Sequence, residues 1–143
     1  MTIPDSSCKI CDHTWPLRDH LIGQLKLTNV YLFEDQYFAG WTVLVLDDHV
    51  TELFSLSQDA RSALIEEVSQ VAYTLSVVFE AKKINYELLG NQIPHIHWHI
   101  IPRQANDPAP LQPVWCIQHS PVRLTGSQLT DRIQRIRWVL PIH

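Results

Sequence analysis

The chain has 143 residues, of which 45% are hydrophobic and 18% are charged, and its formal net charge is -4. This length is typical of one domain with a core of its own, and the negative charge argues against a general basic surface for nucleic acid or anionic membrane. No signal-peptide pattern opens the sequence, and no apolar run approaches the roughly 20 residues of a membrane helix. We therefore expect a cytoplasmic protein that contacts neither nucleic acid nor membrane.

Several segments of the chain have the residue types of strands, and others have the patterning of helices. Strands are expected at residues 25–34, 38–46, 84–89 and 96–102. Helices are expected at residues 14–22, 58–82 and 128–140. In the longest helix Leu64, Val68 and Leu75 recur at helical spacing, and Ser57 is placed to cap the first turn. This order of elements implies an α+β domain built on an antiparallel sheet.

A proline-rich stretch from Pro102 to Pro121 lies between the last strand and the C-terminal helix. Proline lacks a backbone N–H, so this stretch cannot form a long regular element. We therefore expect a single domain over residues 1–143, with a proline-rich extension from about residue 103.

Three histidines alternate with apolar residues in the last expected strand. His95, His97 and His99 are separated by Ile96 and Trp98. Successive side chains of a strand point to opposite faces, so the three imidazoles share one face at steps of about 6.6 Å. Imidazole titrates near neutral pH, and the nearby Arg103 is a cation able to bind an oxyanion.

Three interpretations of this strand compete. The histidines could be ordinary half-exposed polar positions, although histidine is not a favoured strand residue and three occur here in strict alternation. They could be metal ligands, since His-x-His on a strand is a common ligand arrangement. They could also serve nucleophilic catalysis, in which a neutral imidazole attacks phosphorus.

The run from His95 to Arg103 resembles the signature of the histidine triad (HIT) family, in which three histidines alternate with apolar residues. Asn85 is similar to an asparagine that precedes the triad in Hint-like members. Gly90, Asn91 and Gln92 stand where members carry a Gly-Gln-Ser or Gly-Gln-Thr loop. The resemblance covers roughly residues 8–103. It implies a sheet of about five antiparallel strands with one long central helix and a C-terminal helix.

The resemblance also implies a mechanism and a partner. The middle histidine, His97, would attack the α-phosphate of a nucleotide, and water or another acceptor would resolve the nucleotidyl-histidine. His99 would contact the phosphate oxygens or the leaving group, and His95 would orient the middle ring or bind metal. A backbone carbonyl that accepts from Nδ1 would present Nε2 of the nucleophile to phosphorus. The expected protein is a homodimeric hydrolase of dinucleoside polyphosphates or nucleoside phosphoramidates.

The loop before the triad departs from the family pattern. Hint-like and Fhit-like members carry a hydroxyl residue at the position that Gln92 occupies here. A glutamine amide can donate to a phosphate oxygen or leaving group, but it cannot pass a proton along as readily. Gln92 is expected among the catalytic residues. Because it replaces a hydroxyl residue, the sequence does not determine how the leaving group is protonated.

Cys8 and Cys11 have the spacing of half a zinc site, and CxxC alone is a weak signal. Some bacterial HIT proteins, which this chain resembles, complete such a pair with a histidine after the second strand and the first triad histidine. Here these would be His49 and His95, a set typical of structural zinc. His13 or His20 could substitute as a ligand. The two cysteines could instead be ordinary thiols of an N-terminal arm.

The resemblance places the nucleotide between the first two strands and the triad. The residues expected to contact it are Phe33, Asp35, Asn85, Asn91 and Arg103. Asp35 could equally be a turn residue, and Phe33 a core residue. Trp41 and Trp98 are expected in the core, and Trp115 could cover the site. A protein that binds nucleotide or zinc without turnover is the alternative to the enzyme.

Overall fold

A single antiparallel sheet of five strands organises the computed structural model, which describes residues 5–142. Its strand order is β1-β2-β3-β5-β4. The strands are β1 (Leu21–Gln24), β2 (Thr28–Leu32), β3 (Thr42–Leu46), β4 (Lys83–Glu87) and β5 (His97–Arg103). The α-helices are α1 (Gln58–Val78) and α2 (Gly126–Val139), and short 3-10 turns are η1 (Arg18–His20), η2 (Leu53–Ser55) and η3 (Val114–Cys116). The α+β prediction, with a long central helix and a C-terminal helix, is confirmed.

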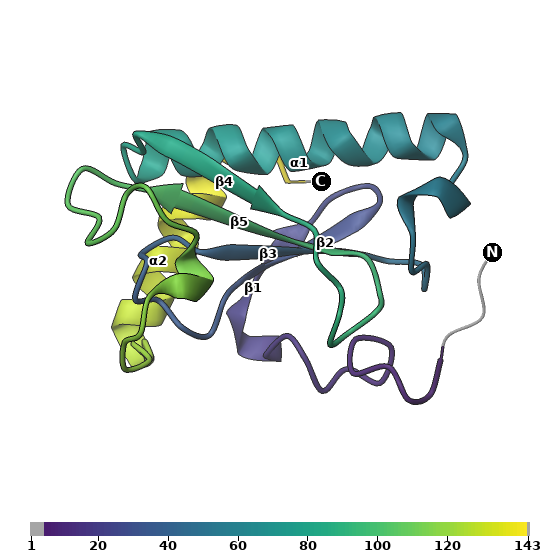
Figure 1. Ribbon diagram of the computed structural model, residues 1–143, viewed down its shortest axis with the longest axis horizontal. Coiled ribbons are helices and arrows are strands. Elements are labelled where there is room, and N and C mark those ends of the chain that lie inside the picture. Colours follow the sequence, from purple (N-terminus) through teal and green to yellow (C-terminus); the bar gives the residue numbers. More distant parts are fainter. Residues whose placement is uncertain (1–4, 143) are drawn as a thin grey trace.

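The two faces of the sheet have different coverings. Leu44 of β3 and Ile100 of β5 pack with apolar residues of both α-helices in the main core. The side chains that alternate with them, including His97 and His99, therefore point to the opposite face. Figure 1 shows α1 along one side of the sheet, with the segment before β1 and the loop between β4 and β5 on the other side. This second face is the one that carries the triad.

Helix α1 begins where its sequence predicts. The Ser57 hydroxyl accepts from the Ala60 N–H at 3.1 Å and so caps the first turn. One buried side chain of this helix is charged. The Glu67 carboxylate accepts from the Leu27 N–H at 2.8 Å and the Thr28 hydroxyl at 2.6 Å, which ties α1 to the start of β2. None of the helices within residues 5–142 is both long and apolar enough to cross a bilayer.

Some predicted elements are wrong in type or extent. Residues 14–22 are not a helix, because only η1 winds and Leu21–Gln24 pairs with β2 as an edge strand. Strand pairing outweighs the local helix preference of this segment. The predicted helix over 58–82 ends at Val78, and Glu80 adopts a φ of 51° where the chain turns towards β4.

The strand predicted over residues 38–46 begins at Thr42, because the residues before it form a tight loop. Gly40 has a φ of 93°, and a Cβ on this residue would lie 2.7 Å from the Phe79 ring and 2.8 Å from Pro102. A side chain at position 40 would therefore clash, and the positive φ favours glycine. The close approach holds this loop against the sheet beside β5.

Candidate active site and metal centre

A cavity of about 660 Å³ lies on the triad face of the sheet. This volume is within the range of small-molecule sites. The walls come from distant parts of the chain: the N-terminal segment, the end of β2, the loop between β4 and β5, β5 itself and η3. The side chains at the triad end are His97 and His99, and those around them include Trp15, Phe33 and Trp115.

His97 is held with one ring nitrogen free. Its Nδ1 donates to the carbonyl oxygen of His95 at 2.7 Å, so the proton is on Nδ1 and Nε2 keeps its lone pair. Burial lowers the pKa of His97, since a charged imidazolium is poorly solvated there. A neutral ring with an unprotonated Nε2 is the form that can attack an electrophile.

His99 is held in the opposite tautomer. The indole N–H of Trp41 donates to His99 Nδ1 at 2.9 Å, and an indole nitrogen cannot accept. The proton of the neutral His99 ring is therefore on Nε2. Burial, helped by the neighbouring His97, lowers the pKa of His99 to about 4, so the ring is neutral near pH 7. The two rings, 5.4 Å apart between centroids, thus offer a lone pair and an N–H donor.

Trp41 is expected to control the His99 tautomer. In Trp41→Phe the aromatic packing is largely kept but the N–H donor is lost, so Nδ1 of His99 is no longer required to accept. Long-range ¹H–¹⁵N NMR of the ring nitrogens should show a mixture of tautomers in the variant and one tautomer in wild type. Trp138→Phe is the control, because Trp138 is 92% exposed on α2. An unchanged His99 spectrum in Trp41→Phe would contradict the assignment.

A second cluster joins the N-terminal segment to the sheet. The Sγ atoms of Cys8 and Cys11 each lie 3.6 Å from Nδ1 of His95, and Nδ1 of His49 lies 3.3 Å from Cys11 Sγ and 3.2 Å from His95 Nδ1. A tetrahedral zinc ion places sulfur and nitrogen ligands about 3.5 Å apart and two nitrogens about 3.3 Å apart. All four ligand atoms lie within 4.8 Å of one another. This group could hold a metal ion.

His95 presents Nδ1 to this cluster because its other nitrogen is engaged. His95 Nε2 donates to the carbonyl oxygen of Leu46 at 2.7 Å, so Nδ1 carries a lone pair. Metal-binding histidines usually donate their second N–H in this way, which fixes the ring. Within residues 5–142 neither His13 nor His20 joins the group, and His20 Nδ1 lies 3.1 Å from the Leu32 carbonyl instead.

The comparisons with known proteins agree with this geometry. The HIT domain family matches residues 17–106, more than half of the chain. The chain belongs to the HIT family. Membership implies a fold of nucleotide-binding proteins and hydrolases. No curated protein matches the chain.

Solved HIT structures resemble this HIT protein over most of its length. A histidine triad protein from Bradyrhizobium japonicum is 29% identical, with a TM-score of 0.75 over 87% of this chain and 93% of its own. One from Marinobacter aquaeolei VT8 is 30% identical, with a TM-score of 0.75 over 85% and 88%. A Zn-bound histidine triad family protein from Mycobacterium smegmatis is 16% identical, with a TM-score of 0.68 over 94% and 93%.

Several residues expected at the nucleotide do line the cavity of this HIT protein. Asn91 and Gln92 line it from the loop between β4 and β5. This loop turns at Gly90, whose φ of 71° is a conformation that favours glycine. Phe33 lines it from the end of β2, with its ring 5.4 Å from the His99 ring and stacked on Trp41.

Arg103 and Asn85 lie outside the cavity. The Arg103 side chain is 4% exposed and donates to the Asp107 carboxylate, to Asn85 Oδ1 at 2.8 Å, and to the carbonyls of Ala109 and Gln112 at 2.7 Å each. A guanidinium has five N–H donors, and each has a partner here. Arg103 therefore fixes the proline-rich segment to the sheet, and no donor is left for a phosphate.

Asp35 also lies outside the cavity. Its carboxylate accepts from the Tyr37 N–H at 3.0 Å, the Val122 N–H at 3.0 Å and His119 Nε2 at 2.7 Å. These hydrogen bonds lower the pKa of Asp35 although burial opposes them. Asp35 is therefore a turn residue, which was the alternative expectation for it. Its contacts join the β2–β3 loop to the segment before α2.

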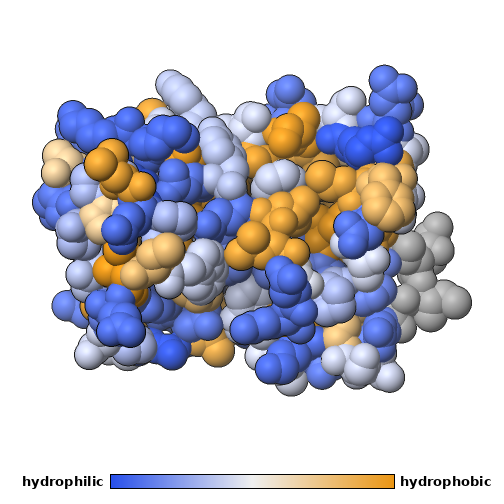
Figure 2. Space-filling model, in the orientation of Figure 1, coloured by the Kyte–Doolittle hydropathy of each residue, from blue (hydrophilic) through white to orange (hydrophobic). Residues whose placement is uncertain are grey.

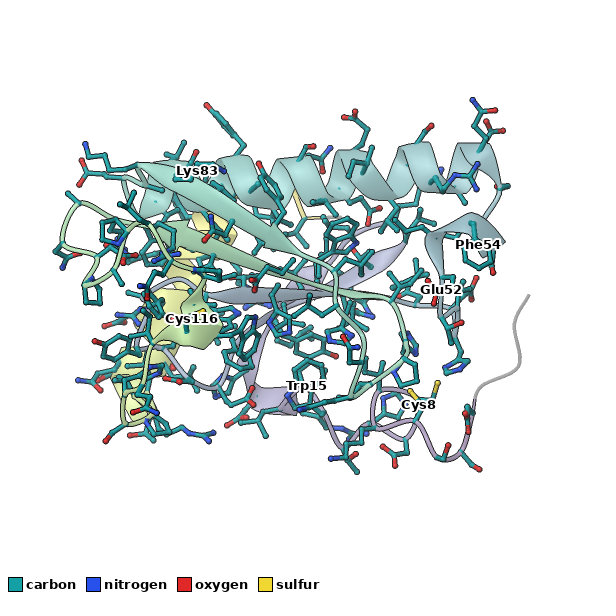
Figure 3. All side chains as sticks on the ribbon, in the orientation of Figure 1. Cys8, Trp15, Glu52, Phe54, Lys83 and Cys116 are labelled. Carbon is teal, nitrogen blue, oxygen red and sulfur yellow. The ribbon has the colours of Figure 1, made fainter. Side chains whose placement is uncertain are left out.

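The sequence did not indicate the residues that the N-terminal segment brings to the cavity. Lys9, Thr14 and Trp15 line it, together with Glu34. The Trp15 ring lies 5.2 Å from the His97 ring and 6.3 Å from the His99 ring, and Figure 3 shows Trp15 on the side of the sheet away from α1. The available signal was the CxxC pair, because an arm tied to His95 must cross the triad face.

Proposed function

We propose that this HIT protein cleaves nucleotides at the α-phosphate through a nucleotidyl-histidine on His97. Dinucleoside polyphosphates and nucleoside phosphoramidates are the proposed substrates. The observation that carries the proposal is the pair of opposite tautomers, His97 with a free Nε2 lone pair and His99 with an Nε2–H donor. Both rings line a cavity large enough for a nucleotide, beside the aromatic side chains of Trp15 and Phe33.

The proposed reaction has two displacements. His97 Nε2 forms a bond to the α-phosphorus, and the bond from phosphorus to the leaving oxygen or nitrogen breaks. Water then attacks the same phosphorus, the N–P bond breaks, and a nucleoside monophosphate leaves with His97 regenerated. The N–H of His99 donates to a phosphoryl oxygen or to the leaving group and stabilises the charge that develops there.

Gln92 is proposed to act on the leaving group as a donor. Its side-chain amide has two N–H donors and lines the cavity in the loop before the triad. An amide does not release a proton at neutral pH, so the proton of an amine or phosphate leaving group must come from His99 or solvent. Asn91 is proposed as a second polar contact of the nucleotide from this loop.

We propose zinc as the metal of the Cys8, Cys11, His49 and His95 group. Two thiolates and two imidazoles make a closed tetrahedral set, which is typical of structural zinc. When bound, zinc supplies a cross-link and no open coordination position. The spacing of the ligand atoms supports this assignment, and the Mycobacterium smegmatis relative is a Zn-bound protein of the same fold.

We also propose a homodimer. Strand β4 is an edge of the sheet, and its Tyr86 is half exposed. The exposed apolar residues Ile65, Tyr73 and Val77 form a stripe at helical spacing on α1. Figure 2 shows apolar side chains gathering in the middle of the view, between α1 and the loop that follows β4. An unpaired edge with apolar neighbours is suited to a second copy.

If the protein is a homodimer, its sedimentation coefficient in analytical ultracentrifugation should be that of two chains. Tyr73→Arg places a charge in the proposed contact, and it should shift the protein to a single chain at micromolar concentration. Cys116→Arg is the control, because Cys116 is also exposed and lies in η3, outside α1 and β4. Wild type that sediments as one chain at all concentrations would refute the dimer.

Turnover of diadenosine polyphosphate and adenosine phosphoramidate tests the enzymatic function. The product should be AMP, and mass spectrometry of acid-sensitive peptides from quenched reactions should find the adenylyl group on the peptide that contains His97. A wild-type protein that binds AMP but turns over no substrate would favour the alternative, a nucleotide- or zinc-binding protein without turnover.

A further inference from the structure

The cavity needs a cation that the triad does not provide. Phosphate oxygens bring negative charge, whereas His97 and His99 act in the proposed reaction as uncharged rings whose Nδ1 hydrogen bonds fix a free Nε2 lone pair and an Nε2–H donor. Arg103, the expected cation, has all five donors engaged elsewhere. Among the described residues that line the cavity, the charged side chains other than histidine are Lys9 and Glu34. The Glu34 carboxylate already accepts from the Trp15 indole N–H at 3.2 Å.

Lys9 stands between the two cysteines of the metal group. The segment 8–15, which we call the cysteine arm, closes into a loop on the backbone of this residue. The Lys9 carbonyl accepts from the Thr14 N–H at 2.9 Å and from the Trp15 N–H at 3.1 Å. One segment therefore carries two metal ligands, Cys8 and Cys11, and three residues of the cavity wall.

The cysteine arm is held to the sheet at both of its ends. At one end Cys8 and Cys11 face His95, which is anchored to Leu46 in β3. At the other end Trp15 packs edge-on against His97. Figure 3 shows Cys8 and Trp15 following one another along this segment, beneath the strands. A metal ion bound by Cys8 and Cys11 would fix the backbone on either side of Lys9.

We propose that the cysteine arm is a metal-dependent wall of the nucleotide site. In this wall Lys9 pairs with oxygens of the phosphates beyond the α-phosphate that His97 attacks. This inference rests on the proposed nucleotide function and adds to it a phosphate-binding residue and a role for the metal in substrate affinity. Lys9 is an exposed point charge on a flexible stem, so it suits a polyphosphate chain better than a single fixed oxygen. The metal organises the arm and does not contact the nucleotide.

Calorimetric titration of the zinc-loaded protein with ADP, AMP and adenosine tests the role of Lys9. Lys9→Met should weaken ADP binding about tenfold and AMP binding about threefold, because a charge-assisted contact is lost, and should leave adenosine binding unchanged. The loss should shrink at high salt. Lys26→Met is the matched control, since Lys26 is exposed and does not line the cavity. Circular dichroism checks that both variants fold.

The same titrations after removal of zinc by a chelator test the dependence on metal. Metal-free wild type should bind ADP about tenfold more weakly than the zinc-loaded protein. In the metal-free protein Lys9→Met should lower ADP affinity by less than about twofold, because the arm no longer holds position 9 at the cavity. ADP affinity within about twofold of wild type in zinc-loaded Lys9→Met would overturn the phosphate role while leaving the proposed function intact. If Lys9→Met still lowered ADP affinity tenfold in the metal-free protein, the proposed dependence of the Lys9 contact on metal would be overturned. Wild type that binds none of the three ligands would instead refute the proposed function itself.

Discussion

His97→Ala should lower kcat for diadenosine polyphosphate hydrolysis by at least about 10⁴-fold, because no other group can take the place of an attacking imidazole nitrogen. His99 cannot substitute, since Trp41 donates to its Nδ1 and its Nε2 carries the proton. AMP affinity should change by less than about threefold, since the aromatic walls at Trp15, Phe33 and Trp115 are left in place. The measurements are steady-state kinetics and calorimetric titration.

A cavity variant separates the loss of the nucleophile from a loss of structure. His97→Gly removes the ring and leaves space in which free imidazole can bind, so added imidazole should restore part of the turnover. His119→Ala is the control, because His119 bonds to Asp35 outside the cavity. Turnover in His97→Ala above about a tenth of wild type would show that another group attacks phosphorus.

The face of the triad was predictable because it depends on local rules. A strand alternates its side chains, so the sequence alone places His97 and His99 together and opposite Ile100. The long helix was predictable for the same reason, since its cap and apolar spacing lie within one segment. Its end at Val78 depends on where the chain must turn to pair β4, which no local pattern specifies.

The roles of the ring nitrogens were not predictable, because they depend on partners distant in the chain. Trp41 reads as a core residue, and only its packing beside β5 shows that its N–H sets the His99 tautomer. For Trp41 the sequence missed a role in the site, whereas for Arg103 it predicted a role that the fold does not support. Its position after the triad suggested an oxyanion ligand, whereas the fold places Asp107 and main-chain carbonyls around the guanidinium. Competition among partners for one side chain is settled by three-dimensional packing.

Cys8→Ser should abolish stable zinc binding. Protein purified without added metal should contain about one zinc per chain in wild type and almost none in the variant, since serine is a poor zinc ligand at neutral pH. Cys116→Ser is a matched control, because Cys116 is an exposed thiol outside the group. Elemental analysis gives the metal content, and equal zinc in both variants would refute the site.

The loss of zinc should also lower stability, because the ion binds the folded ligand set and not the unfolded chain. Free zinc at 1,000 times its Kd contributes about 4 kcal/mol to the free energy of unfolding, and urea titration should show this difference between wild type and Cys8→Ser. The triad should survive the loss. His97 is oriented by the backbone carbonyl of His95, which strand β5 and the Leu46 contact hold without metal. We therefore expect Cys8→Ser to keep its nucleophile at reduced stability, whereas His97→Ala keeps its zinc and loses its chemistry.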